Sequence, residues 1–169
     1  MRAALDELFP GPDLDRDVWF PYYLPHWSTR AESAATWSVH AGELHLTIPP
    51  EQPLWCPDTH GEPLRVSCVQ TGSFSGPVGS AVGQQPFADG LVVREEQPEF
   101  RGWTPEYGRG QVRMRAVLDD ASMVAFWMSG VEDRPGARAR SAWRRSSGTP
   151  CGRARRRSAW ASRPSATRC

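Results

Sequence analysis

Residues 42–48 read GELHLTI, and this stretch decides the fold class. Aliphatic side chains at positions 44, 46 and 48 alternate with polar ones at 43, 45 and 47. A period of two is typical of a β-strand with one buried face, because successive side chains on a strand point to opposite faces. We therefore predict a strand here, with Leu44, Leu46 and Ile48 facing a core.

Further strand patterns lie on the C-terminal side of this one. They are LRVSCVQTG (64–72), GLVVREEQ (90–97), GQVRMRAVL (110–118) and SMVAFWMSG (122–130). The last is almost wholly apolar, as expected for a strand buried on both faces. No window of residues 18–133 has the period of a long amphipathic helix, and Gly and Pro punctuate the connections. These features predict an all-β sandwich over 18–133, preceded by an N-terminal arm over 1–17.

Residues 134–169 have a different composition. They contain only Arg, Pro, Gly, Ala, Ser, Trp, Thr and Cys, and no acidic residue. Residues 1–133 hold all 19 acidic residues and nine arginines, so an acidic body of net charge −10 precedes a basic tail of +11. Because the tail has too few apolar side chains to offset its ordering entropy, we predict that it is disordered.

Several classes of protein are disfavoured by the sequence. No apolar run is long enough for a signal peptide or a transmembrane helix, so the chain as written is expected to be cytoplasmic and to have no membrane span. The histidines and cysteines lack the spacing of a zinc site, and no phosphate-binding loop is present, so no metal or cofactor is expected. Cys56 and Cys68 are expected to be free thiols.

Five segments in order carry a resemblance to a known family. They are WFPYYLPHWS (19–28), GELHLTI (42–48), RVSCVQTG (65–72), TPEYGRGQVRMRA (104–116) and MVAFWMSGVEDRP (123–135). This series resembles glycoside hydrolase family 16, of the concanavalin A-like lectin and glucanase superfamily. The resemblance implies an antiparallel jelly-roll sandwich, incomplete in this chain, with a polysaccharide as substrate and a retaining mechanism.

The same resemblance implies a strand of the pattern E-x-D-x-(x)-E directly after the Trp-Met strand. One Glu would be the nucleophile and the other the general acid/base, since retaining hydrolysis needs two carboxyl groups about 5–5.5 Å apart. After Pro135 the sequence has no Asp or Glu. Although the family implies an O-glycosyl hydrolase, we therefore expect this chain to be catalytically inactive.

A frameshift after Pro135 accounts for the lost carboxylates. The peptide PERSGEICVAEVFGDAVR, written in one set of synonymous codons, becomes PGARARSAWRRSSGTPCG when a single base is removed. That second text is residues 135–152 of this chain. The absence of lysine also indicates GC-rich coding, which produces Arg and Ala codons in any frame. We hypothesise that the tail is a truncated family 16 sequence read out of frame.

Three residues are predicted to contact a glycan. Trp127 could pack against a sugar ring, or it could be a core residue of an apolar strand. Trp103 lies between Gly102 and Pro105, which places it on a loop. Gln70 could bind a sugar hydroxyl, or it could be a solvated residue at a strand end.

The carboxylate pairs Glu95–Glu96 and Glu132–Asp133 are expected to be solvated charges, because adjacent residues of a strand face opposite ways. Two other functions are open. One is a lectin-like module that binds glycan without hydrolysis. The other, less favoured, is non-specific contact of the Arg-rich tail with nucleic acid or another polyanion.

Overall fold

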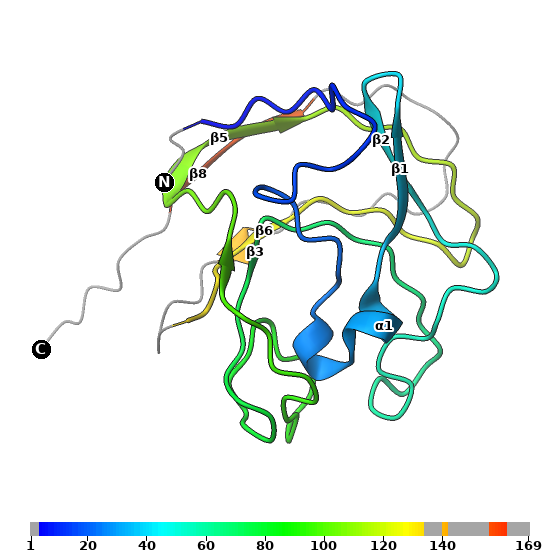
Figure 1. Ribbon diagram of the computed structural model, residues 1–169, viewed down its shortest axis with the longest axis vertical. Coiled ribbons are helices and arrows are strands. Elements are labelled where there is room, and N and C mark those ends of the chain that lie inside the picture. Colours follow the sequence, from blue (N-terminus) through cyan, green and yellow to red (C-terminus); the bar gives the residue numbers. More distant parts are fainter. Residues whose placement is uncertain (1–3, 134–139, 142–155, 162–169) are drawn as a thin grey trace, which may run out of the picture. The chain divides into compact units, whose positions relative to one another are not determined.

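The computed structural model describes residues 4–133, 140–141 and 156–161 of the chain (Figure 1). The regular structure of these residues is almost entirely β-strand, arranged as antiparallel two-stranded sheets. The predicted all-β class is confirmed, and the fold is that of an incomplete β-sandwich. The chain has two compact units: unit 1 is Met1–Thr104 with Val131–Ala137, and unit 2 is Pro105–Gly130 with Arg138–Cys169.

Unit 1 begins with two short helices and continues with strands. Its elements are η1 (Pro25–Trp27), α1 (Arg30–Ser33), β1 (Thr36–His40), β2 (Glu43–Thr47), β3 (Gly72–Ser73) and β4 (Phe100–Arg101). β1 pairs with β2, and β3 pairs with β4. Residues 4–17, predicted as an arm, contact the rest of unit 1, since Leu14 is buried and Glu7 accepts a hydrogen bond from Trp19 Nε1 at 2.9 Å.

The predicted strand over 42–48 is confirmed as β2. It forms a hairpin with β1 through a two-residue turn at Ala41 and Gly42, both at positive φ, as a type I′ turn requires. The predicted buried face is wrong: Leu46 and Ile48 are 42% and 51% exposed. The hairpin forms a sheet of two strands, and within β2 only Leu44 and His45 are buried, each in part.

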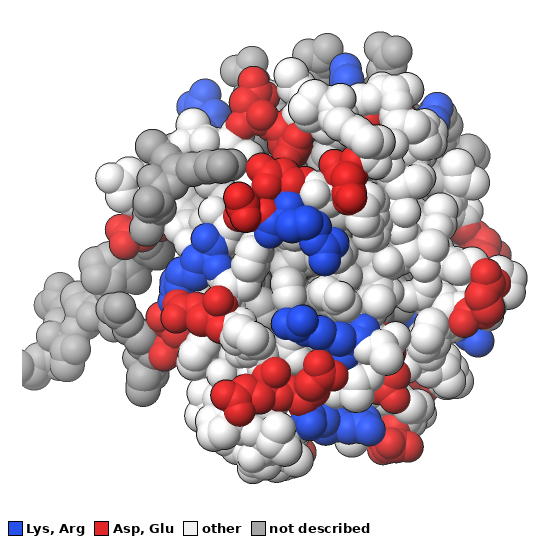
Figure 2. Space-filling model, viewed as in Figure 1, with Lys and Arg blue, Asp and Glu red and all other residues white. Residues whose placement is uncertain are grey.

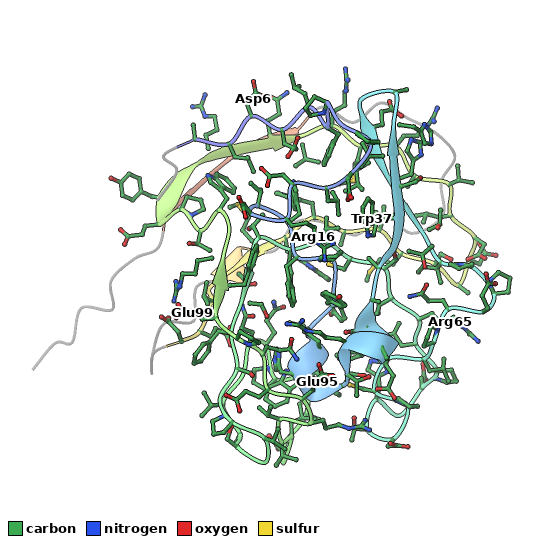
Figure 3. All side chains as sticks on the ribbon, viewed as in Figure 1. Asp6, Arg16, Trp37, Arg65, Glu95 and Glu99 are labelled. Carbon is green, nitrogen blue, oxygen red and sulfur yellow. The ribbon has the colours of Figure 1, made fainter. Side chains whose placement is uncertain are left out.

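Two predicted strands of unit 1 are present in part. Residues 64–72 make isolated bridges, with Arg65 opposite Leu54 and Gln70 opposite Phe20, before β3 starts. Residues 90–97 form no assigned strand, although the side chains at 91, 93, 95 and 97 turn inward alternately. Glu95, predicted to be solvated, is half-buried beside α1 (Figure 3), where its Oε2 accepts the Arg30 N–H at 2.8 Å.

Unit 2 contains β5 (Tyr107–Val112), β6 (Met128–Ser129), β7 (Arg140–Ser141) and β8 (Arg156–Ala161). β5 begins and ends earlier than the predicted strand over 110–118. The prediction that 122–130 is buried on both faces is wrong, because Met123 is 51% exposed and Trp127 is 44% exposed.

β7 and β8 lie within the tail that was predicted to be disordered. They pair with β6 and β5, so the described residues of the tail are strands. The rest of that prediction falls on residues outside the described part of the chain.

The core of unit 1 surrounds η1. Its buried members are Leu24, Trp27, Trp55, Cys56 and Val93. Both Cys56 and Cys68 are free thiols, as predicted, and the Cys56 thiol donates to the Trp27 carbonyl at 3.2 Å. None of the helices in the described ranges is long and apolar enough to cross a membrane.

One carbonyl anchors two rings of this core. The Gln84 carbonyl accepts from Trp27 Nε1 at 2.7 Å and lies 3.0 Å from His26 Nε2. Gly83 makes this approach possible, because a Cβ there would lie 2.5 Å from the His26 ring. Burial lowers the pKa of His26 from 6.5 to about 4, so the neutral imidazole donates through Nε2.

We predict that unit 1 loses stability as the pH falls from 6.5 to 4. In this window the unfolded chain binds a proton at His26 and the folded chain does not. Stability therefore rises with pH and is lost on acidification, by about 3 kcal/mol at most for this group. Urea unfolding at several pH values measures the slope.

The variant His26→Gln keeps a donor for the Gln84 carbonyl but does not titrate, so the slope between pH 6.5 and 4 should shrink. His60→Gln is the matched control, since the His60 ring bonds only to the Glu62 carbonyl nearby. An unchanged slope in His26→Gln would mean that His26 is not the buried neutral group.

Candidate functional site

Several buried polar side chains lie in β3 or on segments next to β3 and β4. Four of their atoms are buried and have no hydrogen-bond partner: Gln70 Nε2, Ser73 Oγ, Trp103 Nε1 and Glu132 Oε1. These four residues are called the β3–β4 patch below. Because an unsatisfied buried polar group costs about 1–3 kcal/mol, these four side chains are candidates for contact with a ligand.

Gln70 reaches the patch through backbone pairing with the N-terminal part of the unit. Its N–H and carbonyl exchange hydrogen bonds with Phe20 at 3.0 and 2.8 Å. The Phe20 ring stacks on the Phe100 ring of β4, with the two ring centroids 5.5 Å apart. The guanidinium of Arg30, which belongs to α1, lies 5.5 Å from the centroid of the Phe20 ring. The backbone of Gln70 is thus fixed, and its side-chain amide donor remains unused.

A bulge after β4 positions Trp103. The N–H groups of Gly102 and Trp103 both donate to the Thr71 carbonyl, at 3.0 and 3.2 Å. Two residues of one strand that lie opposite a single residue of the other form a β-bulge, which redirects the side chains that follow it. Gly102 is required at this point, because a Cβ there would lie 2.3 Å from the Val18 carbonyl oxygen.

Gly72 brings a third segment to the patch. A Cβ on Gly72 would lie 3.0 Å from Thr104 Cγ2 and 3.4 Å from Val131 Cγ2. The segment that begins with Val131 is held there by an ion pair, in which Asp133 Oδ2 accepts from Arg101 Nη2 at 2.5 Å. Arg101 also bonds to Glu99, which lies next to β4 in Figure 3.

Glu132 is fixed at one oxygen only. Its Oε2 accepts the Gln85 N–H at 3.0 Å, while its Oε1 is buried without a partner. Neither residue is glycine, yet Glu132 has φ +58° and Gln85 has φ +49°. Such left-handed conformations cost free energy and often occur where a side chain must be aimed.

Arg101 of β4 is paired with two carboxylates. Hydrogen bonds from the Arg101 guanidinium to Glu99 and Asp133 raise the pKa of Arg101 further above its usual value. On the face of the molecule in Figure 2, arginines lie among carboxylates and form no broad basic area. The patch therefore offers two neutral donors, a hydroxyl and a carboxylate, which are the groups that bind sugar hydroxyls.

The three predicted site residues lie in different units of the structure. Gln70 and Trp103 both belong to the patch, since each flanks the Thr71 link between β3 and the bulge. Trp127 belongs to unit 2, where its 44% exposure contradicts the alternative of a core residue. Whether the three contact a glycan remains a prediction.

The sequence interpretation missed Ser73 and Glu132. Glu132 was expected to be solvated with Asp133, but it is half-buried and Asp133 is ion-paired. Glu132 contacts Gln85, 47 positions away, and no local pattern indicates such a contact. Ser73, fully buried in a Ser-Phe-Ser run, has no distinguishing neighbour in the sequence.

Other features of the described residues are weaker candidates. A hollow of about 220 Å³ is lined by Trp27, Thr59, Ala88, Asp89, Gly90, Leu91, Val92 and Arg94. Trp27 presents only 1% of its surface there, and Arg94 is paired with Asp58 at 3.7 Å. In the part of the chain that the structure describes, no group of three or more His, Cys, Asp or Glu could hold a metal ion. The predicted polyanion contact rests on tail arginines whose side chains lie outside that part.

We predict that Ser73→Ala leaves the free energy of unfolding unchanged or raises it by up to about 1 kcal/mol, because the lost hydroxyl has no partner. Ser75→Ala is the matched control. The Ser75 hydroxyl accepts the Gln97 N–H at 2.8 Å, so its loss should cost about 1–3 kcal/mol. Chemical denaturation measures both, and a cost for Ser73→Ala equal to that for Ser75→Ala would contradict the assignment of Ser73 to the patch.

No family model matches the chain, and no curated protein matches it. Among solved structures, the chain is similar to the GlcNAcα1-4Gal-releasing endo-β-galactosidase from Clostridium perfringens, with a TM-score of 0.60 and 32% sequence identity. The match covers 77% of this chain and 30% of that one, so this chain spans less than a third of the length of its structural relative. This chain has a glycosidase-like β fold, shared with part of that endo-β-galactosidase.

Proposed function

We propose that the chain derives from a retaining glycoside hydrolase of the family 16 type, which acts on O-glycosidic bonds of a polysaccharide. The observation that carries this proposal is 32% identity over 77% of the chain with a protein named as an endo-β-galactosidase. The assignment to family 16 comes from the five sequence segments that resemble that family and occur in the same order. Within the proposal, residues 1–17 are an arm, 18–133 a partial sandwich and 134–169 an out-of-frame tail.

We further propose that this chain does not hydrolyse glycans. A retaining mechanism needs two carboxyl groups about 5–5.5 Å apart, one as nucleophile and one as acid/base. No carboxylate follows Asp133 in the sequence, and Asp133 is held in an ion pair with Arg101. Glu132 is held through one oxygen by the Gln85 N–H.

The pairing of β6 with β7 supports the frameshift part of the proposal. In this pairing, position 140 lies opposite Ser129 and position 141 opposite Met128. The restored frame, PERSGEICVAEVFGDAVR, puts glutamates at positions 136, 140 and 145, of which the last two have the spacing of the expected pair. A glutamate at position 140 would then stand beside Ser129, two residues from Trp127 along the neighbouring strand. Since residues two apart share a face of a strand, Trp127 and this glutamate would line one surface.

The second candidate is a lectin-like module, and the β3–β4 patch favours it. Unsatisfied donors and acceptors that lie near an aromatic ring suit sugar hydroxyls, and their use requires no catalytic carboxylates. Both functions predict glycan binding. They differ in whether a restored frame brings hydrolysis.

We predict that inserting the missing base after codon 135, with the downstream frame extended to the next stop codon, restores hydrolysis. The expected activity on β-galactan or β-glucan polysaccharides is measured as released reducing ends. The chain with its present sequence should release none, because its carboxylates cannot form the pair.

The control for this restoration replaces the glutamates at positions 140 and 145 by glutamine in the restored chain. Loss of activity with unchanged circular dichroism would assign the chemistry to the pair. A restored chain that binds glycan but never cleaves it would favour the lectin-like function. Genomic reads that support the present frame in independent isolates would contradict the frameshift.

A further inference from the structure

We propose that the hollow of about 220 Å³ beside Trp27 is a second glycan contact of unit 1, which takes one ring of a neutral sugar. Its lining shares no residue with the β3–β4 patch. The choice of a sugar as occupant rests on the proposed function, whereas the place of the site rests on the residues that form the hollow.

The size of the hollow suits a single ring. At about 30 Å³ for each water molecule, its 220 Å³ holds roughly seven waters. Sites that enclose a drug-sized ligand are larger, at about 300–1,000 Å³. The hollow therefore has room for the ring at the end of a glycan chain and not for several rings in succession.

Backbone hydrogen bonds hold the walls of the hollow. The Arg94 N–H donates to the His26 carbonyl at 2.8 Å, and the Thr59 N–H donates to the Cys56 carbonyl at 3.0 Å. The ring of Trp27 is almost wholly buried against the core and gives the hollow a fixed floor. A site whose walls are already fixed loses little free energy to ordering when a ligand enters.

Polar and apolar groups of the lining together match a sugar ring. Asp89 has a carboxylate, which only accepts hydrogen bonds, and the Arg94 guanidinium only donates them. Ala88 and Leu91 add aliphatic surface. Sugar hydroxyls both donate and accept, and the C–H groups of the ring are apolar. One ring can thus use the acceptor, the donor and the aliphatic surface at once.

The guanidinium of Arg94 is partly exposed and weakly held. Its ion-pair partner is Asp58, with the nitrogen and oxygen atoms 3.7 Å apart. The Asp58 side chain is 76% exposed, and exposed ion pairs of this kind contribute little to stability. The guanidinium can therefore turn from Asp58 to a ligand hydroxyl at small cost.

The test is titration of the full chain with methyl β-galactoside, followed by NMR of the backbone amides. The amide signals of Thr59, Gly90 and Arg94 should shift together with one dissociation constant. Ala88→Trp fills the hollow and should weaken binding at least tenfold. Ala81→Trp places the same ring at an exposed position outside the lining, and it should keep the affinity within threefold.

A second pair of variants tests the polar contact. Asp89→Ala removes the acceptor of the lining and should weaken binding about tenfold. Asp58→Ala removes another exposed carboxylate, which pairs with Arg94 but does not line the hollow, and should change the affinity by threefold or less. Equal losses in the two variants would contradict the role of Asp89.

Two further results would overturn the hollow as a sugar site. One is galactoside binding that survives in Ala88→Trp, or no galactoside binding by the unmodified chain. The other is tighter binding of hexanoate than of the galactoside, which would show that Arg94 holds a carboxylate with an apolar body. Both leave the proposed function standing, because hydrolysis by the restored chain tests that function separately.

Discussion

The structure of unit 1 depends on the two consecutive residues Gln84 and Gln85. The Gln84 carbonyl accepts from Trp27 and faces His26, which closes the core around η1. The side-chain oxygen of Gln84 accepts the Phe74 N–H at 3.0 Å, directly after β3. The Gln85 N–H then holds Glu132. One short segment thus ties the core to the β3–β4 patch, and a shift in its backbone would disturb both. This dependence explains why Gln84, a polar residue, is only 4% exposed.

The fold class could be predicted from local pattern, because alternation and punctuation by Gly and Pro are local properties. The β2 strand and its turn illustrate this, as the period of two and the Ala41–Gly42 turn are contiguous in sequence. Burial could not be predicted in the same way. Leu46 and Ile48 have the pattern of a buried face but are exposed. Alternation shows which side chains share a face of a strand, but it does not show whether another layer covers that face. Some residues of the candidate site could be proposed from the sequence and others could not. Gln70 and Trp103 were proposed from a strand-end position and a loop position, while Glu132 depends on a contact 47 positions away.

The tail shows how far backbone pairing and side-chain chemistry can diverge. Strand pairing uses N–H and carbonyl groups that every residue except proline carries. Residues of the Arg-rich tail can therefore form the strands β7 and β8 opposite β6 and β5, whatever their side chains. Catalysis makes a stricter demand, since it needs particular carboxylates at particular positions. Under the frameshift hypothesis, the tail retains the first property and has lost the second, and its arginines reflect codons in place of selection for a polyanion.

Binding and cleavage are separable in such a chain. The β3–β4 patch is assembled wholly from residues before the tail, and each of its members is positioned by contacts within unit 1. Loss of the carboxylate pair therefore removes the acid and the nucleophile without removing the donors and acceptors of the patch. Under the proposed function, a chain of this kind could lose cleavage and keep the residues of the patch, because the two depend on different segments of the sequence.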